Sequence, residues 1–150
     1  MSKTFAFNKR AGFDYDLLEK FEAGLVLFGH EVKSVKLGHS SLKSSFVTAH
    51  NGELFLINCH IPAYKFSGPM PDYNPDRSRK ILLNKKEINY LIGKTQEKGL
   101  TLTAVRLYNK GNRIKLEFAV ARGKKNYDKR ATIKERETDR EMARELKNNF

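Results

Sequence analysis

Residues 100–121 read LTLTAVRLYNKGNRIKLEFAVA, and this stretch decides the class of fold. Its second half alternates apolar residues with charged or small ones, the apolar positions being Ile114, Leu116, Phe118 and Val120. Side chains of a strand point to alternate faces, so this period of two predicts a half-buried strand over residues 113–121. Residues 109–112 (Asn-Lys-Gly-Asn) supply a turn, and residues 100–108 are predicted as the partner strand of a hairpin.

A second hairpin is predicted for residues 45–50 and 53–58. The Asn51-Gly52 pair between them is a strong hairpin signal, because both residues tolerate the positive φ of a tight turn. Further upstream, residues 15–28 are predicted as a long strand. The spacing of the apolar residues in that stretch also suits a helix, and the sequence leaves this alternative open.

Two short helices are predicted among these strands. Asn84 and Glu87 resemble a capping box, followed at helical spacing by Ile88, Leu91, Ile92 and Thr95 and by a stop at Gly99. Residues 31–37 form the shorter helix. The predicted fold class is therefore mainly β (α+β): a small, oligonucleotide-binding-like antiparallel β-barrel with two or three short helices, in which closure removes vulnerable strand edges.

The charge of the chain indicates the kind of partner. Lys and Arg number 29 against 17 Asp and Glu, a formal charge of +12, and such an excess favours a polyanion. The apolar runs are far shorter than the ~20 residues of a spanning helix, and the first residues do not resemble a signal peptide. A single cysteine, Cys59, fits a reducing cytoplasm. We expect a cytoplasmic protein that binds nucleic acid and no membrane.

Residues 62–80 are predicted as a long loop, because all four prolines of the chain lie there. The loop ends in a dense basic step formed by Arg77, Ser78, Arg79 and Lys80, with no acidic residue before Lys86. We predict phosphate contacts for Arg77, Arg79 and Lys80. The alternative is a solvated loop beside a buried strand.

Residues 122–150 are predicted as a separate basic tail, because apolar residues become sparse after Ala121. A capping box at residues 132–135 predicts a helix over about 132–147. The apolar line of Met142, Leu146 and Phe150 is thin, and an isolated helix of this length is marginal in water. We therefore predict a tail that is disordered alone and helical when docked. A solubilising tail, or a helix packed on the protein's own barrel, remains the alternative.

The sequence resembles the SsrA-binding protein family (small protein B) almost continuously from Asn8 to Lys147. The matching segments are residues 8–11 (NKRA), 21–24 (FEAG), 31–34 (EVKS), 79–83 (RKILL), 123–125 (GKK), 128–130 (DKR) and 133–137 (IKERE). The resemblance implies a monomeric barrel that holds the tRNA-like domain of transfer-messenger RNA and enters stalled ribosomes with it for trans-translation. It also implies contact with small-subunit ribosomal RNA, and indirect partnership with elongation factor Tu and alanyl-tRNA synthetase through the RNA.

The resemblance also implies site residues. Glu22, Leu82 and Lys115 match RNA-binding positions, and Glu31, Lys33, Ser34 and Lys36 resemble part of the same surface. Contacts with the decoding centre and the empty messenger channel are implied for Gly123, Lys124, Lys125, Tyr127, Asp128, Lys129, Arg130, Ile133, Lys134, Arg136, Met142 and Leu146. Tyr127 replaces a histidine of many members, and either ring could stack on a ribosomal base. From the residues alone, Leu82 is more typical of a core, Lys115 could be merely solvated, and Glu22 could be paired inside the protein.

Two other classes of function stay open at this point. A ribonuclease could use His60 with Lys65, or Glu53, as acid and base, but no nucleophile motif supports an enzyme. A ribosomal or initiation-factor-like barrel would bind RNA without transfer-messenger RNA. The four histidines share no metal-ligand spacing, so neither a metal nor a cofactor is expected.

Overall fold

The computed structural model describes residues 3–124 and residue 130. The predicted tail helix over 132–147 lies outside the described residues. The described elements follow one another in the order β1 (Thr4–Phe7), α1 (Ala11–Asp14), β2 (Tyr15–Leu25), α2 (Gly29–Lys36), β3 (Phe46–His50), β4 (Glu53–Ile57), β5 (Arg79–Leu82), α3 (Lys85–Thr95), β6 (Leu100–Lys110) and β7 (Arg113–Gly123).

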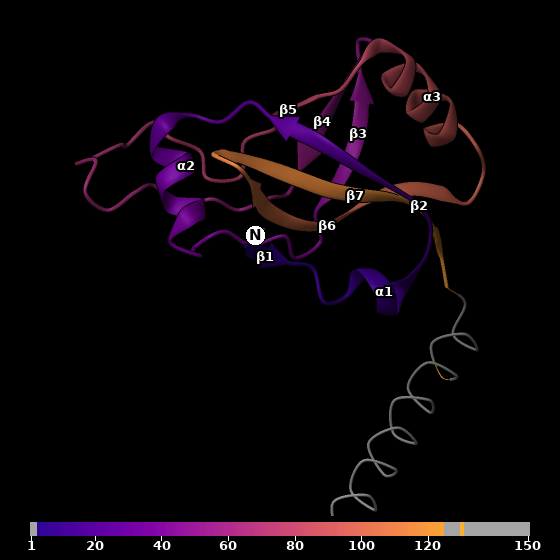
Figure 1. Cartoon of the computed structure of the whole chain (residues 1–150), viewed down its shortest axis with the longest axis horizontal. Helices are drawn as coiled ribbons and strands as arrows, with labels where there is room; N and C mark the ends of the chain where they lie inside the picture. Colours follow the sequence, from indigo (N-terminus) through magenta and orange to yellow (C-terminus); the bar gives the residue numbers. More distant parts are fainter. Residues whose placement is uncertain (1–2, 125–129, 131–150) are drawn as a thin grey trace, which may run out of the picture.

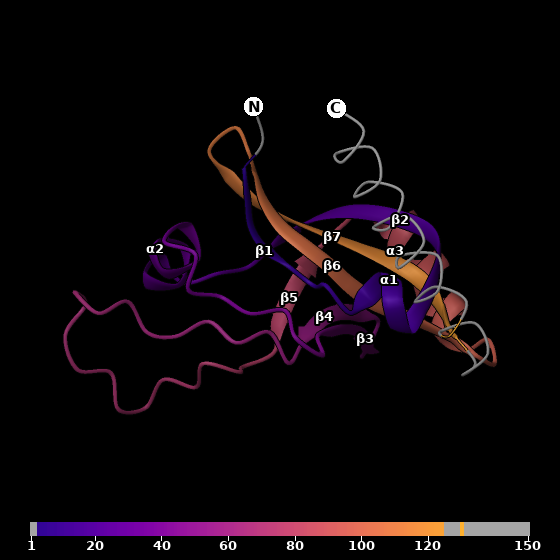
Figure 2. The same ribbon diagram turned by 90° about the horizontal axis from the view of Figure 1, so that it is seen from below.

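The strands form a closed, barrel-like ring (Figures 1 and 2). Every strand pair is antiparallel, and the order β6-β3-β4-β5-β2-β7 returns to its start because β7 also pairs with β6. Strand β1 adds to the outside of this ring by pairing with β6. The helices α2 and α3 lie at opposite ends of the molecule (Figure 1). This arrangement confirms the predicted class of a small, mainly β barrel-like domain with short helices.

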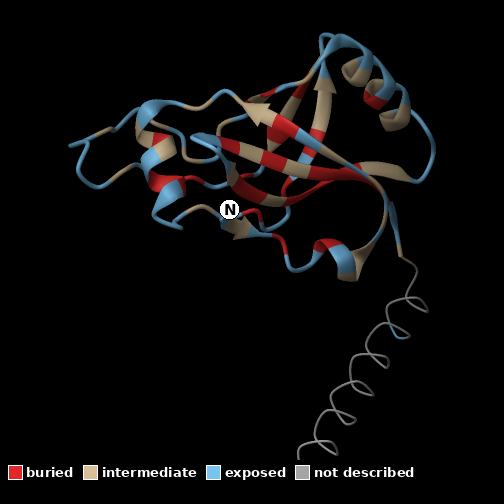
Figure 3. Ribbon diagram, viewed as in Figure 1, coloured by how far each residue is buried: buried red, intermediate tan, exposed pale blue. Residues whose placement is uncertain are grey.

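The hairpin of β6 and β7 is the longest pairing and behaves as predicted. Its ladder runs from Leu100, opposite Arg122, to Lys110, opposite Arg113. The turn is therefore shorter than the predicted four residues, and Gly111 takes the positive φ of 61° that a tight connection requires. The inward residues of β7 build the core, which follows β2, β6 and β7 in Figure 3.

The predictions for β2, β3 and β4 are also confirmed. Strand β2 pairs with β7 from Tyr15, opposite Gly123, to Gly24, opposite Lys115. This long ladder overrides the helical spacing of its leucines. The strand ends at Leu25 rather than residue 28, because the chain then turns into α2. Between β3 and β4, Asn51 and Gly52 both have positive φ, as predicted.

The helix signals were accurate where a cap was present. The Asn84 side chain accepts a hydrogen bond of 2.9 Å from the backbone N–H of Glu87, and α3 follows immediately. Helix α2 begins two residues earlier than predicted, and its Val35 is fully buried. The sequence analysis missed β1 and the single-turn helix α1, which are both four residues long.

Candidate nucleic-acid interface

The outer face of β2, β7 and β6 brings together residues that are far apart in the sequence. The antiparallel register places Gly24 beside Lys115 and Lys115 beside Tyr108. In the neighbouring row, Glu22 lies beside Glu117. Two of the three RNA-binding positions implied by the family resemblance, Glu22 and Lys115, therefore share one face of the sheet.

The third implied position, Leu82, borders the same face. It pairs with Gly24, and its side chain lies over that residue: a Cβ at Gly24 would stand 3.4 Å from the Leu82 Cβ. Leu82 is 49% exposed, so the core reading of this residue is wrong. It helps to line a hollow of about 410 Å³, together with Gly24, Leu25, Leu27, Val32 and residues 112–115. Its lining combines apolar side chains with the basic side chains of Arg113 and Lys115.

Glu22 lies beside this hollow in a polar cluster. The Tyr108 hydroxyl donates a hydrogen bond to one carboxylate oxygen, and the Lys110 Nζ lies 3.0 Å from the other. These two hydrogen bonds lower the pKa of Glu22, with Tyr108 as the larger cause. The facing carboxylate of Glu117 is neutralised by Arg106 and by Lys20, whose Nζ is 3.8 Å away. Glu22 is thus ionised and held in place while part of it remains exposed.

Two basic side chains of this face form no ion pair among the described residues, although one of them, Lys115, helps to lower the pKa of Glu22. Arg113 and Lys115 flank the hollow, and within residues 3–124 neither forms an ion pair. Nearby on α2, Lys33 and Lys36 are exposed and also lack a carboxylate partner among the described residues. These four cations are available to an external anion.

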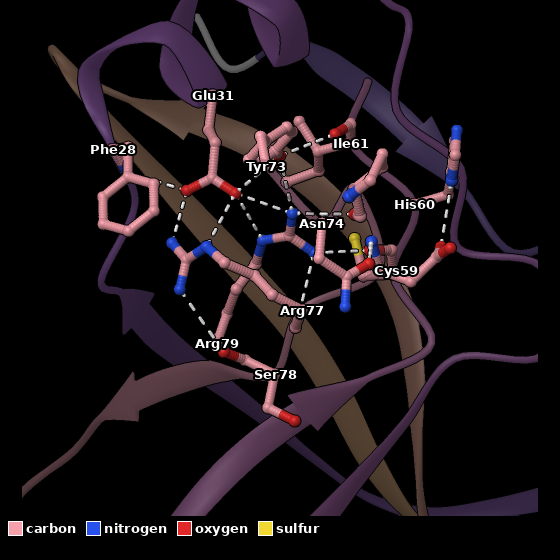
Figure 4. A network of polar contacts seen from close by, with 12 residues as sticks. Phe28, Glu31, Cys59, His60, Ile61, Tyr73, Asn74, Arg77, Ser78 and Arg79 are labelled. Atoms are coloured by element: carbon pink, nitrogen blue, oxygen red, sulfur yellow. Dashed lines mark hydrogen bonds and ion pairs between the residues drawn. The ribbon is translucent and has the colours of Figure 1, made fainter. Parts of the chain in front are cut away.

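The basic step at the end of the long loop has a different role from the one predicted. Figure 4 shows that Glu31 of α2 accepts hydrogen bonds from both arginines of this step, Arg77 and Arg79. Arg79 Nη2 lies 2.6 Å and Arg77 Nε 3.1 Å from Glu31 Oε2, and the Tyr73 hydroxyl donates to the same oxygen at 2.9 Å. Arg79 also donates to the Pro75 carbonyl at 2.9 Å. The network fastens the loop to α2.

Glu31 is ionised although it has no exposed surface. Burial alone would raise the pKa of its carboxyl group. Hydrogen bonds from Arg77, from the backbone N–H of Phe28 and from Arg79 outweigh that effect and lower the pKa to about 2. These donors compensate the buried negative charge of Glu31. Removal of one arginine would leave part of that charge without compensation.

Several predicted RNA contacts are corrected by this burial. Glu31, Ser34 and Arg79 are at most 1% exposed, so their side chains have no surface from which to contact RNA. Lys80 is accessible, but its Nζ lies 3.0 Å from the carboxylate of Glu53. Arg77 is partly exposed, and its guanidinium carbon stands 3.9 Å from the centre of the Phe28 ring. The cations of this loop are mostly neutralised within the protein.

The root of the predicted tail is attached to the domain. Strand β7 continues through Gly123, two residues beyond the predicted boundary at Ala121. The backbone N–H of Lys124 donates to the Asp14 carbonyl at 2.8 Å, and its Nζ donates to the Gly12 carbonyl at 3.0 Å. Arg130 is exposed. The remaining tail residues named above, Lys125, Tyr127, Asp128, Lys129, Ile133, Lys134, Arg136, Met142 and Leu146, lie outside the described part of the chain.

Two of the residues considered for an enzyme, His60 and Glu53, form ion pairs. His60 Nδ1 lies 2.9 Å from Asp76, and Glu53 pairs with Lys80. Burial raises the pKa of the Cys59 thiol to about 11, which opposes a thiolate nucleophile. Over residues 3–124 and 130, no three or more His, Cys, Asp or Glu side chains are placed to hold a metal ion. Among the same residues, no helix is long and apolar enough to span a membrane.

A closed ring of antiparallel strands with an accessible basic outer face defines a small, oligonucleotide-binding-like β-barrel domain. Comparison with known proteins narrows this class. The SmpB protein family model matches residues 5–148, and the chain belongs to this family.

Relatives and a solved structure agree with this assignment. The SsrA-binding protein of Carboxydothermus hydrogenoformans is 48% identical over 98% of both chains. That of Parafrankia sp. is 51% identical over 95% of this chain and 89% of its own. A solved structure described as "tmRNA-SmpB: a journey to the center of the bacterial ribosome" is 42% identical, with a TM-score of 0.66 over 80% of this chain and 84% of the other.

Proposed function

We propose that the protein binds the tRNA-like domain of transfer-messenger RNA and delivers it to stalled ribosomes for trans-translation. The observation that carries the proposal is the convergence of Glu22, Leu82 and Lys115 on one outer face of the barrel. The family resemblance implies these three positions as RNA contacts, and the SsrA-binding relatives support the identity of the RNA.

Each part of the face suits a different part of an RNA. The ammonium of Lys115 and the guanidinium of Arg113 neutralise phosphates and release counterions. Leu82 and the other apolar side chains of the hollow pack against a ribose or a base. Glu22 accepts hydrogen bonds from a 2′-hydroxyl or a base amino group, which a phosphate cannot donate. The exposed Lys33 and Lys36 extend the basic surface along α2.

The residues beyond Lys124 have a second role in this proposal. They occupy the decoding centre and the vacant messenger channel, where an empty channel distinguishes a stalled ribosome from a translating one. The attachment of Lys124 to α1 supports this division, because it fixes where the tail leaves the barrel. The protein acts as a monomer without catalytic chemistry of its own. Elongation factor Tu and alanyl-tRNA synthetase act on the same RNA rather than on the protein.

Competition binding tests the first role. Full-length protein is titrated with labelled tRNA-like domain of transfer-messenger RNA, and unlabelled tRNA or bulk cellular RNA is added as competitor at fixed salt. We expect the transfer-messenger RNA domain to be displaced only by a large excess of either competitor. Equal competition by bulk RNA would reduce the function to general affinity for polyanions.

Truncation tests the division between barrel and tail. Ending the chain after Lys124 keeps the whole of β7, the pairing of Gly123 with Tyr15 and the hydrogen bond from Lys124 to Asp14. Ending it after Ala121 would remove both of these contacts. We expect the chain that ends at Lys124 to bind the isolated RNA domain with nearly unchanged affinity and to lose tagging of nascent chains on stalled ribosomes. Loss of RNA binding by this variant would contradict the assignment.

A further inference from the structure

A second hollow lies on the other side of α2 and is not used by the proposed contacts. Its volume is about 510 Å³, and it is lined by Phe28, His30 and residues 69–73. The lining is mainly apolar and aromatic. The His30 ring stands 4.6 Å from the Tyr73 ring at 89° and 5.8 Å from the Phe28 ring at 38°. Phe28 is 50% exposed, so a flat aromatic surface is open to a ligand.

The walls of this second hollow are held rigidly. The Arg77 guanidinium rests 3.9 Å from the centre of the Phe28 ring and is itself fixed by Glu31. The hydroxyl oxygen of Tyr73 lies 2.9 Å from the same carboxylate and 2.7 Å from the Ile61 carbonyl, so its single proton is held between two acceptors. A stacking surface that is already ordered loses little conformational freedom when a ligand binds.

The chemistry of the lining selects the kind of ligand. The carboxylate of Asp72 lines the second hollow and would repel a phosphate, but it can accept a hydrogen bond from an amino group. A flat, neutral, polar-edged ring fits these conditions.

Both hollows border helix α2. Val32 of α2 lines the first hollow and His30 lines the second, so the two lie on either side of one helix. Lys33 and Lys36 are exposed on the same helix and form no ion pair within residues 3–124, although the Lys33 ammonium lies 5.4 Å from the centre of the Tyr64 ring. An RNA backbone that follows these lysines would reach both hollows.

We propose that the second hollow binds an unpaired nucleobase of the RNA held by the barrel, stacked on Phe28 and His30. Its edge contacts Asp72, while the phosphates on either side of it lie along α2. This inference rests on the proposed function and adds a base-stacking contact to it. Stacking on an aromatic side chain contributes about 1–3 kcal/mol of binding free energy per base, and it tolerates any base because every base has a flat π-face.

Substitution of the aromatic surface tests the proposal in the full chain. Phe28→Ala and His30→Ala should each weaken binding of the tRNA-like RNA domain roughly tenfold, the effect expected for one lost stacking contact. The dependence of affinity on salt should keep its slope, because no phosphate contact is removed. Phe28→Tyr, which keeps the aromatic ring, should bind the RNA domain as tightly as the wild type.

The matched control is Tyr90→Ala on α3. Tyr90 is 43% exposed and has the ammonium of Lys94 5.4 Å from its ring. It belongs to α3, which lies at the opposite end of the molecule from α2 (Figure 1). Its substitution should leave RNA affinity unchanged. Thermal unfolding of every variant identifies loss of folding, and His30→Ala keeps the test decisive if Phe28→Ala loosens Arg77.

The outcomes separate this inference from the proposed function. If wild-type protein prefers the transfer-messenger RNA domain and both alanine variants bind it equally well, the base-binding site is refuted while the function stands. If the variants bind RNA normally but fail in ribosome rescue, the second hollow serves another macromolecule and the proposal is also refuted. Loss of preference in the wild type would instead refute the function itself.

Discussion

Residues 77–80 and residues 113–115 are both basic, yet the fold treats their side chains in opposite ways. Arg77 and Arg79 are bound by Glu31, and Lys80 is paired with Glu53. Arg113 and Lys115 form no ion pair within residues 3–124, although Lys115 is near enough to Glu22 to help lower the pKa of that carboxyl group. The first segment uses its charge to fasten a loop, and the second leaves its charge for a partner. The charge of a segment therefore indicates its role only when the contacts made by distant residues are known.

The largest expected difference between the two segments is in stability. Arg79→Ala should lower the free energy of unfolding by about 3–5 kcal/mol, because it leaves Glu31 buried with fewer donors. Arg113→Ala should change it by no more than about 0.5 kcal/mol, since that side chain is exposed. Urea unfolding measures both. Similar losses in the two variants would mean that the comparison is false.

Acid should weaken the network that holds the first segment. The folded-state pKa of Glu31, about 2, lies below its ordinary value of 4.5. A lowered pKa stabilises the fold fully above the ordinary value, and this contribution, about 3 kcal/mol, disappears as the pH falls from about 4.5 towards 2. Unfolding measured between pH 7 and pH 2 should show this loss in the wild type. In Glu31→Gln the curve should be flatter over that range; an unchanged pH dependence would exclude Glu31 as its source.

Leu82 and its neighbour Ile81 sharpen the distinction between surface and core. Leu82→Ala should weaken RNA binding roughly fivefold through lost apolar contact, with little loss of stability because the side chain is half exposed. Ile81→Ala, at a position only 1% exposed, should instead cost about 2–5 kcal/mol of stability. Fluorescence anisotropy with the RNA domain and thermal unfolding separate the two effects. An unaltered affinity in Leu82→Ala would remove the first hollow from the interface.

The smallest expected effect concerns the salt dependence of binding. Lys115→Ala should reduce the slope of log affinity against log salt concentration by about one unit, corresponding to one phosphate contact. Lys80→Ala should change it less, because Glu53 already neutralises that ammonium. Titrations at several salt concentrations measure both slopes. Equal changes would show that the internal ion pair does not keep Lys80 from RNA.

Much of the fold could be predicted because its signals are local. The alternation in β7, the Asn51-Gly52 turn and the Asn84 cap each act within a few residues, and each was confirmed. The elements β1 and α1 could not be predicted, since four residues are too few to show a period. Strand β1 depends on its pairing with β6, which lies about a hundred residues later.

The site was less predictable for the same reason. Nothing near Arg79 announces that its partner is Glu31, because the pair is separated by 48 residues and meets only after the loop folds onto α2. Likewise, the apolar run around Leu82 suggests a core, and only the register of β5 against β2 shows that this side chain faces outward beside Gly24. The face that carries Glu22 and Lys115 depends on the β2–β7 register in the same way.

Strand β7 carries Lys115 near one end and Gly123 at the other, and hydrogen bonds from β2 and β6 hold it on both sides. From Lys115 to Gly123 it measures about 26 Å at roughly 3.3 Å per residue. Strand β7 therefore sets the distance between Lys115 and the point at which the C-terminal segment leaves the barrel. Inserting two residues into β7 would move that point by about 7 Å and keep every side chain on its present face of the sheet. Inserting one residue would move the core-facing side chains beyond it to the outer face.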